Sequence, residues 1–285
     1  MARAASLKPY AFLGFPVAVL MVFTLLPTVA GLGLSFFEWD GGSHLRFVGL
    51  RNFQNLWLDG AFGPAFKNTL LFVVLSVPPT LMIGFLLAAA LSARWFVGQT
   101  IVRTMVFLPT VVSIVAVGFI WRWVLDPQSG LLLLFMRTLG ATAAEEWARG
   151  PYWIPAWIVI VSVWRGIGFC VVLYMSAIAG IGESLYEAAA IDGASRMRTL
   201  FEITWKQVRP TSAFLLVTGV IGALQVFDIV FVMTGQQETQ WTSVLNLYLY
   251  RQFSQGNFGY AAAIGTVLFG LSLVAAAGSR VGKKS

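Results

Sequence analysis

Charged side chains are scarce in this chain of 285 residues, where Asp, Glu, Lys and Arg together account for only 11%. Soluble proteins carry about a quarter charged residues. The deficit therefore excludes a disordered chain, a coiled coil and a protein that coats nucleic acid, and it argues against a water-soluble enzyme. Hydrophobic residues make up 58% of the sequence and the mean hydropathy is +0.79, a composition typical of a membrane protein.

Cysteine and histidine occur once each, as Cys170 in an apolar run and His44 in a polar loop. A single cysteine provides neither a disulfide framework nor a cysteine-based metal site, and a lone histidine in a loop is a typical surface residue. The sequence contains no Gly-x-x-x-x-Gly-Lys-Ser/Thr loop for nucleotide phosphates and no pairing of a nucleophile with a base. It therefore gives no indication of a metal site, a nucleotide site or a membrane enzyme.

Six apolar stretches are each long enough to cross a bilayer, which takes about 20 residues of helix. Helices are expected because spanning strands would show short segments of alternating polarity. The sequence thus predicts an all-α polytopic membrane protein with six transmembrane helices. The predicted spans are residues 10–37, 68–91, 102–125, 152–178, 211–234 and 258–277.

The 19 Lys and Arg residues are unevenly distributed among the predicted loops. With the N-terminus inside, the inside segments hold eleven of them and the outside loops six, while Arg122 and Arg165 lie within spans. Because cytoplasmic loops of membrane proteins collect Lys and Arg, both termini are predicted to be cytoplasmic. The net charge of +7 then reflects topology and contact with anionic lipid, and no nucleic-acid partner is expected.

Two of the predicted outside loops carry apolar residues. The stretch 131–136 is too short to span a bilayer and predicts a helix that lies on the surface. The loop 235–257 mixes aromatic and polar residues. That mixture fits either interfacial anchoring of Trp and Tyr rings or a docking surface for an external protein.

The longest inside loop, residues 180–210, is also the most charged, and its pattern predicts two short helices joined by a sharp bend. Ser184 and Glu187 have the spacing of a capping box at the start of the first helix. Asp192 and Gly193 mark the bend, because glycine suits the left-handed end of a helix. From the residues alone, this elbow is either a plain surface helix beneath the bundle or a rigid knob for a socket on a cytoplasmic partner.

Within this elbow, Glu187, Ala188 and Ala189, followed by Gly193 and Ile203, resemble the EAA motif of binding-protein-dependent ABC transporter permeases. The family pattern is Glu-Ala-Ala, three residues, Gly, nine residues, Ile, one residue and Leu-Pro. The Glu-Ala-Ala, Gly and Ile stand in register here, whereas the Leu-Pro pair is absent.

Other segments are similar to the carbohydrate-importing branch of these permeases, which includes the maltose and glycerol-phosphate types. Many members have Gly-Gly-Pro at the positions that residues 236–238, Gln-Gln-Glu, occupy here. The similar segments are residues 47–53, 68–69, 107–109, 121–123, 164–166, 225–228 and 258–263.

The resemblance implies a single permease domain over residues 1–285, with the fold of a type I ABC importer, in a bacterial or archaeal cytoplasmic membrane. It implies four kinds of partner: a second permease subunit, two cytoplasmic ATPase subunits that bind ATP and Mg, an extracytoplasmic sugar-binding protein, and membrane lipid. The chain itself would be non-catalytic and would bind no cofactor. The residues that would couple it to an ATPase are Glu187, Ala188, Ala189, Asp192, Gly193 and Ile203.

Arg165 and Asp228 are charged residues inside predicted spans, where a charge is costly and usually faces a bundle interior or water. They form either a structural ion pair or clamp, or the lining of a cavity in which Arg165 donates hydrogen bonds to a solute. Gln225, Asn246 and Trp123 are further candidates for the pathway, because they offer hydrogen bonds and an aromatic platform for a sugar.

Two functions remain open from the residues: a permease subunit for a sugar, oligosaccharide or polyol, and a self-contained secondary transporter or channel for a small polar solute. The second needs a coupling-ion site at broken helices within related halves of the chain. No internal repeat is evident, and Asp228 alone supplies few ligands for a coupling ion. The sequence therefore favours the ATP-driven importer.

Overall fold

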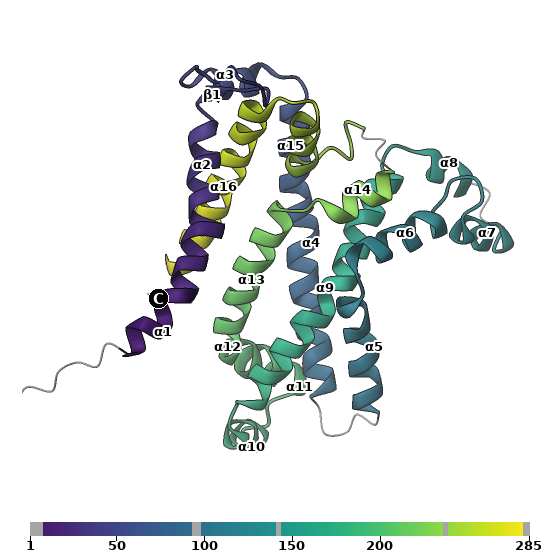
Figure 1. Cartoon of the computed structure of the whole chain (residues 1–285). Coiled ribbons are helices and arrows are strands. Elements are labelled where there is room, and N and C mark those ends of the chain that lie inside the picture. The colour runs from purple at the N-terminus through teal and green to yellow at the C-terminus, as the bar shows by residue number, and fades with distance from the viewer. Residues whose placement is uncertain (1–7, 93–97, 141–143, 236–238, 282–285) are drawn as a thin grey trace, which may run out of the picture. The chain divides into compact units, whose positions relative to one another are not determined.

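The structure is a computed structural model (Figure 1), and most of the chain that it describes is helical. A single antiparallel hairpin of two short strands completes this described part. The description covers residues 8–92, 98–140, 144–235 and 239–281.

The chain divides into two compact units. Unit 1 takes in residues 1–62 and 248–270, and unit 2 takes in residues 63–247 and 271–285. Each unit has its own packing and its own cavity, and each is described separately below.

Unit 1 begins with a long apolar helical segment, residues 8–34, and continues in a small cap formed by the hairpin and the helix that follows it, residues 37–58. Pro27 lies in the first turn of α2, directly after the π-helical η1, and its missing N–H removes one donor from this continuous helical segment. Gly41 turns the hairpin with φ of +88°, and the strand register places Glu38 opposite Arg46. The elements are α1 (Lys8–Leu20), the π-helical η1 (Met21–Leu25), α2 (Leu26–Leu34), β1 (Phe37–Glu38), β2 (Arg46–Phe47), α3 (Arg51–Leu58), and the parts of α15 (Leu245–Ser254) and α16 (Phe258–Val281) that fall within the unit.

Close backbone contacts and one buried amide hold the cap in place. The side-chain amide of buried Asn52 donates hydrogen bonds to the carbonyls of Ser35 and Phe37, at 2.8 and 2.9 Å. Gly259, at the start of α16, lies directly against the Phe37 carbonyl, so no side chain fits there. The hairpin is therefore fixed on both of its sides.

Unit 2 is a bundle whose two ends carry shorter helices. In Figure 1, α10, α11 and α12 lie at one end of α9 and α13, whereas α6, α7, α8 and α14 gather at the other. The elements are α4 (Phe62–Leu91), α5 (Gln99–Val111), α6 (Ile114–Val124), α7 (Leu131–Thr138), α8 (Ala144–Arg149), α9 (Trp153–Ala179), α10 (Glu183–Ile191), α11 (Arg196–Thr199), the π-helical η2 (Leu200–Thr204), α12 (Trp205–Gln207), α13 (Arg209–Leu224) and α14 (Asp228–Thr234).

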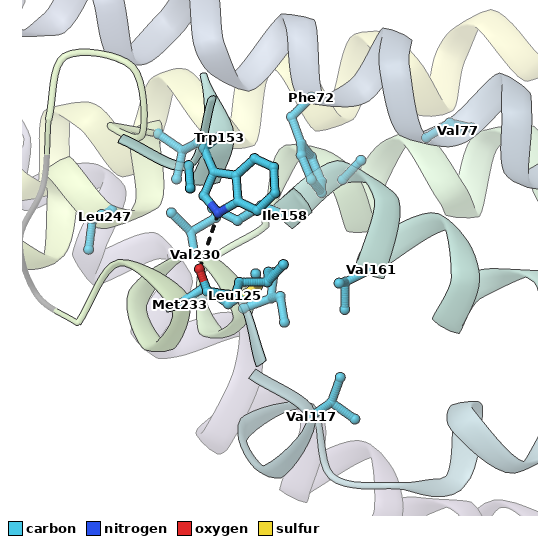
Figure 2. Packing of buried hydrophobic residues seen from close by; sticks show 14 of the residues in the cluster. Phe72, Val77, Val117, Leu125, Trp153, Ile158, Val161, Val230, Met233 and Leu247 are labelled. Atoms are coloured by element: carbon cyan, nitrogen blue, oxygen red, sulfur yellow. Dashed lines mark hydrogen bonds between the residues drawn. The ribbon is translucent and has the colours of Figure 1, made fainter. Parts of the chain in front are cut away.

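The larger core cluster of unit 2 joins α9 to α6 and α14 (Figure 2). The indole N–H of Trp153 donates to the carbonyl of Leu125 at 3.1 Å, which satisfies the last turn of α6. Ile158 packs with Val230 and Met233 of α14, and all three are buried. In a membrane protein such packing stabilises through van der Waals contact more than through removal of water.

Four described helical segments are long and apolar enough to cross a membrane, or up to six if each bent pair counts as one span. A mostly helical membrane protein is therefore confirmed, and the helix predicted at 131–136 is present as α7. The four segments are Leu13–Leu34, Phe62–Leu91, Trp153–Ala179 and Phe258–Gly278.

The third predicted span, 102–125, is wrong as a straight helix. Its two halves, α5 and α6, meet at an angle of 97°. Pro109 lies just before the end of α5, Val112 adopts an extended conformation, and Ser113 precedes the new helix. The proline removes a helical donor and the β-branched residues that follow favour extended backbone, so the helix ends inside a predominantly apolar run.

The fifth predicted span, 211–234, is likewise wrong as a single helix. Helix α13 ends at Leu224, and α14 begins at Asp228 after three non-helical residues. Phe227 has φ of −144° and ψ of −63°, which breaks the helical path before Asp228. At its other end, α13 is bent by 68° from the helical segment Arg196–Gln207.

Candidate functional site

The elbow between α9 and α13 is closed by a Schellman motif. Gly193 has φ of +71°, and its N–H donates to the carbonyl of Ala190 at 3.1 Å. The N–H of Ala194 donates to the carbonyl of Ala189 at 2.9 Å. These are the two reversed hydrogen bonds that end a helix at a left-handed glycine, and the bend predicted at Asp192 and Gly193 is confirmed.

The start of α10 differs from the predicted capping box. The residue before the helix is Gly182, in an extended conformation, and no side chain caps it. Ser184 is therefore the second residue of α10 and is unable to act as the cap. Ser195 does begin the next helix, because its hydroxyl accepts a hydrogen bond from the N–H of Arg198 at 3.3 Å.

The outer surface of the elbow exposes large apolar side chains that nothing in the described chain covers. Ile191 is 87% exposed, Met197 61% and Phe201 50%. Glu187 and Ala188 are exposed beside them, as are Asp192 and Gly193 at the bend, whereas Ala189 is buried and Ile203 is partly buried. An exposed apolar surface of this kind is typical of a site that contacts another protein.

The inner side of the elbow is fastened to the bundle. The hydroxyls of Tyr186 and Thr204 share a hydrogen bond of 3.1 Å between α10 and η2. The ring of Trp205 packs edge-on against Phe85 of α4, with 4.9 Å between centroids. Tyr174 of α9 packs against the same Phe85 ring. The elbow is therefore in contact with α4 through Phe85, and Phe85 in turn contacts α9.

A cavity of about 500 Å³ lies in unit 2, beside the break between α13 and α14. It brings together three of the residues predicted for the solute pathway, Arg165, Gln225 and Asp228. Apolar side chains form most of the remaining wall. The other members of its lining that matter below are Ser76, Thr80, Thr110, Ser162, Thr218 and Phe227.

Arg165 lines this cavity and carries a buried donor. Its Nε is buried and has no hydrogen-bond partner among the described residues. Its backbone carbonyl accepts a hydrogen bond from the Thr110 hydroxyl at 2.9 Å, which ties α9 to α5. Within the described part of the chain no ion pair joins Arg165 to Asp228, so both charges face the cavity without neutralising each other directly.

Five hydroxyl residues in the wall, Ser76, Thr80, Thr110, Ser162 and Thr218, were missed by the sequence analysis. Ser76, Thr80 and Ser162 each donate to the backbone carbonyl four residues earlier, at 2.5 to 2.7 Å. Because their protons are committed to the backbone, these hydroxyls can act toward a solute only as acceptors. The signal was available, because Ser76 and Thr80 are one helical turn apart in an apolar span and so share one face.

Two other predicted pathway residues lie elsewhere. Trp123 is on α6 and is 65% exposed, and Asn246 is partly buried in the first turn of α15. Neither lines the cavity that holds Arg165. Residues 236–238, where the sequence departs from the family pattern, fall outside the described residues.

Residues 69–281 match the family described as the inner membrane component of binding-protein-dependent transport systems. The match covers well over half of the chain, so the chain belongs to this family. The family resemblance inferred from the EAA motif is therefore confirmed.

Similar proteins and structures agree with this assignment. The probable ABC transporter permease protein YurN of Bacillus subtilis is 31% identical over 272 residues, covering 93% of this chain and 92% of YurN. The lactose transport system permease protein LacF of Rhizobium radiobacter is 32% identical over 263 residues, covering 90% and 87%. One chain in a crystal structure of a bacterial alginate ABC transporter, in complex with a periplasmic protein that holds an alginate pentasaccharide, matches with a TM-score of 0.84 and 28% identity, covering 98% of this chain and 96% of that one.

The prediction of an importer permease is thus confirmed at the level of the family. The alternative, a self-contained secondary transporter or channel, finds no support, because the family and the similar proteins are components of transport systems with several subunits.

Proposed function

We propose that this chain is one of two permease subunits in an ATP-driven importer that carries a carbohydrate across a bacterial or archaeal cytoplasmic membrane. An extracytoplasmic binding protein delivers the solute, and two ATPase subunits bind ATP and Mg. The chain contributes the pathway and the coupling surface and catalyses no reaction itself. The observation that carries the proposal is the elbow of α10, which is exposed on one side and joined on the other to helices that line a cavity.

In this proposal the chain crosses the membrane six times, each bent pair counting as one span, and both units belong to one permease domain. The excess of Lys and Arg in the predicted inside segments supports cytoplasmic termini. The elbow of α10 then lies on the cytoplasmic side, where the ATPase subunits are. Its exposed Ile191 and the exposed EAA residues around Glu187 form the surface that enters an ATPase groove.

Helix α9 provides the mechanical link between the elbow and the cavity. Tyr174 on this helix packs near the elbow, and Arg165 on the same helix faces the cavity. The two are nine residues apart, or about 14 Å along a helix. When ATP closes the ATPase pair, displacement of the elbow moves α9 as a rigid body and alters access to the cavity. This change is driven by the difference between the binding free energies of the elbow for the open and the closed ATPase pair.

The cavity suits an uncharged polyhydroxylated solute. Its volume of about 500 Å³ lies in the range of small-molecule sites. Arg165 supplies donors, while Asp228 and the hydroxyl oxygens supply acceptors, so one wall can satisfy both sides of a sugar hydroxyl. The similar protein LacF belongs to a lactose transport system, which supports a sugar as the solute.

The proposal is tested on the purified assembly in liposomes, by measuring ATP hydrolysis and sugar uptake together. Glu187→Lys reverses a charge on the elbow and should leave membrane insertion and basal ATP hydrolysis in place while uptake is lost. Glu146→Lys makes the same charge change at an exposed residue of α8 and should transport normally. Full uptake by the Glu187 variant at normal expression, or uptake by the lone chain without ATP, would overturn the proposal.

A further inference from the structure

Unit 1 contains a second cavity, of about 720 Å³, that the function proposed above leaves unused. The hairpin and α3 form one part of its wall, and α15 and the start of α16 form the other. All but one of the lining residues fall in two segments between predicted spans, residues 38–67 and 235–257, which are both outside on the proposed topology. The cavity therefore lies on the side where the binding protein delivers solute.

The wall of this cavity is held rigid by polar contacts within unit 1. The carboxylate of Asp59 accepts hydrogen bonds from the hydroxyls of Tyr248 and Tyr260, the latter at 2.7 Å. Burial and the neighbouring Asp59 raise the pKa of Tyr248 to about 12, so its hydroxyl keeps its proton and donates. The side-chain amide of Asn257 donates to the Gln252 side-chain oxygen at 2.8 Å. These groups are occupied in holding the frame.

Another set of polar groups in the lining is uncommitted. Glu38 and Arg46 are opposite each other in the hairpin register. They form no ion pair within the described residues, and neither makes a side-chain hydrogen bond there. Asn55 and His44 line the same space and are likewise without side-chain partners in the described chain. Together they offer planar donors and acceptors, the groups that recognise adjacent sugar hydroxyls through paired hydrogen bonds.

Trp39 supplies an apolar platform in the same cavity. Its ring packs against Phe258 with centroids 5.2 Å apart, and its indole N–H donates to the carbonyl of Gly42 at 2.8 Å. The ring is therefore fixed in orientation and remains only partly buried where it lines the cavity. The C–H face of a pyranose packs well on such a ring.

We propose that this cavity of unit 1 is an outer binding subsite for one or two residues of a neutral saccharide, separate from the cavity that holds Arg165. The inference rests on the proposed function, because it takes a carbohydrate to be the solute. The charge of the lining argues for a neutral sugar: Glu38, Asp40 and Asp59 outnumber the single arginine, Arg46, so an acidic sugar would be repelled. The volume also lies within the range of small-molecule sites.

Cysteine protection tests the subsite directly. The chain has a single cysteine, Cys170, which is 6% exposed and gives little background. Asn55→Cys places a thiol in the cavity, and Gln54→Cys places one on the same helix, exposed and outside the lining. Each variant is made in the complete assembly. The rate of maleimide labelling is then measured with lactose, maltose, sucrose or diacetylchitobiose, and with glucuronate as an acidic probe, and the uptake of each sugar is measured in parallel.

The transported neutral sugar should slow labelling at position 55 about tenfold when its concentration is ten times its Kd. Labelling at position 54 should stay unchanged, and glucuronate should protect neither position. Glu38→Gln should raise the sugar concentration needed for protection about tenfold, as expected for loss of a charged hydrogen bond.

Five outcomes decide between these possibilities. Uptake of a sugar that does not protect position 55 overturns the subsite and leaves the proposed function standing. Equal protection of both positions, or protection by the binding protein without sugar, overturns the subsite as well, the latter because it identifies a protein contact. Protection by glucuronate overturns the preference for a neutral ligand. Uptake of none of the sugars overturns the proposed function, and the subsite with it.

Discussion

Gly193 provides the sharpest test of the elbow as a coupling device. It holds φ of +71°, and a Cβ placed there would meet no atom within 4 Å. The cost of a side chain at this position is therefore a backbone cost alone. For most residues the left-handed conformation costs roughly 1–2 kcal/mol, and a β-branched residue such as valine, which rarely adopts it, costs at least the middle of that range. A cost of about 1.4 kcal/mol lowers the population of the elbow geometry about tenfold.

Gly193→Val should therefore lower ATP-driven uptake about tenfold, by the same conversion of energy to population, with little loss of assembly or of basal ATP hydrolysis. Gly193→Asn is the matched control, because asparagine, like valine, adds a side chain at this position but adopts the left-handed region readily. Uptake and ATP hydrolysis are measured on the same liposomes, and subunit stoichiometry is checked on the same preparation. If the valine and asparagine variants transport equally well, the geometry of the bend plays no part in coupling.

Three further predictions concern Arg165, the packing of α9 at Gly168, and the Asp59 cluster. Arg165→Ala should raise the KM for sugar uptake about tenfold or more, since a hydrogen bond to a charged group is worth about 1.5–3 kcal/mol, and an unchanged KM would remove this residue from the pathway. Gly168→Leu should destabilise unit 2 by about 1–3 kcal/mol through overpacking, because this glycine lies against Thr110. A thermal unfolding midpoint equal to that of the unchanged chain would refute this. Burial alone would raise the pKa of Asp59, but hydrogen bonds from Tyr248, from the Ala61 N–H and from Tyr260 outweigh it and lower the pKa below the usual 3.8. The resulting stability of unit 1 is present above that usual value and is lost as the pH falls through the lowered one. The protection factors of the α15 amides, which compare each exchange rate with its intrinsic rate at the same pH, should therefore fall at acid pH, and Asp59→Asn should abolish this fall.

Local signals made the elbow predictable from the sequence. Gly193 determines the bend through its own backbone freedom, and Ser195 caps the next helix through a contact only three residues away. Length and apolarity likewise sufficed for the long helices α4, α9 and α16. Features of this kind depend on neighbours in the chain, so a sequence reveals them.

The two broken helices were hidden because hydropathy stays high across each break. At Val112 and at Phe227 the backbone leaves the helical region. The few polar residues beside each break, such as Ser113 and Gln225, are outweighed by apolar neighbours in a window that averages hydrophobicity. The Asp59 cluster was hidden for another reason. Its partners Tyr248 and Tyr260 lie 189 and 201 positions further along the chain, and no local pattern connects them. Arg165 and Asp228 were recognised by their cost in a membrane, although only the fold places them around one cavity.

The stiffness of α9 depends on its contacts with the neighbouring helices α4 and α5. Gly166 and Gly168 weaken the middle of this helix, since glycine is a poor helix former, yet each is clamped by a threonine, Thr80 on α4 and Thr110 on α5. If either threonine contact were lost, α9 would be free to bend at its glycines. In the proposed mechanism, a displacement of the elbow would then bend α9 and would no longer move Arg165.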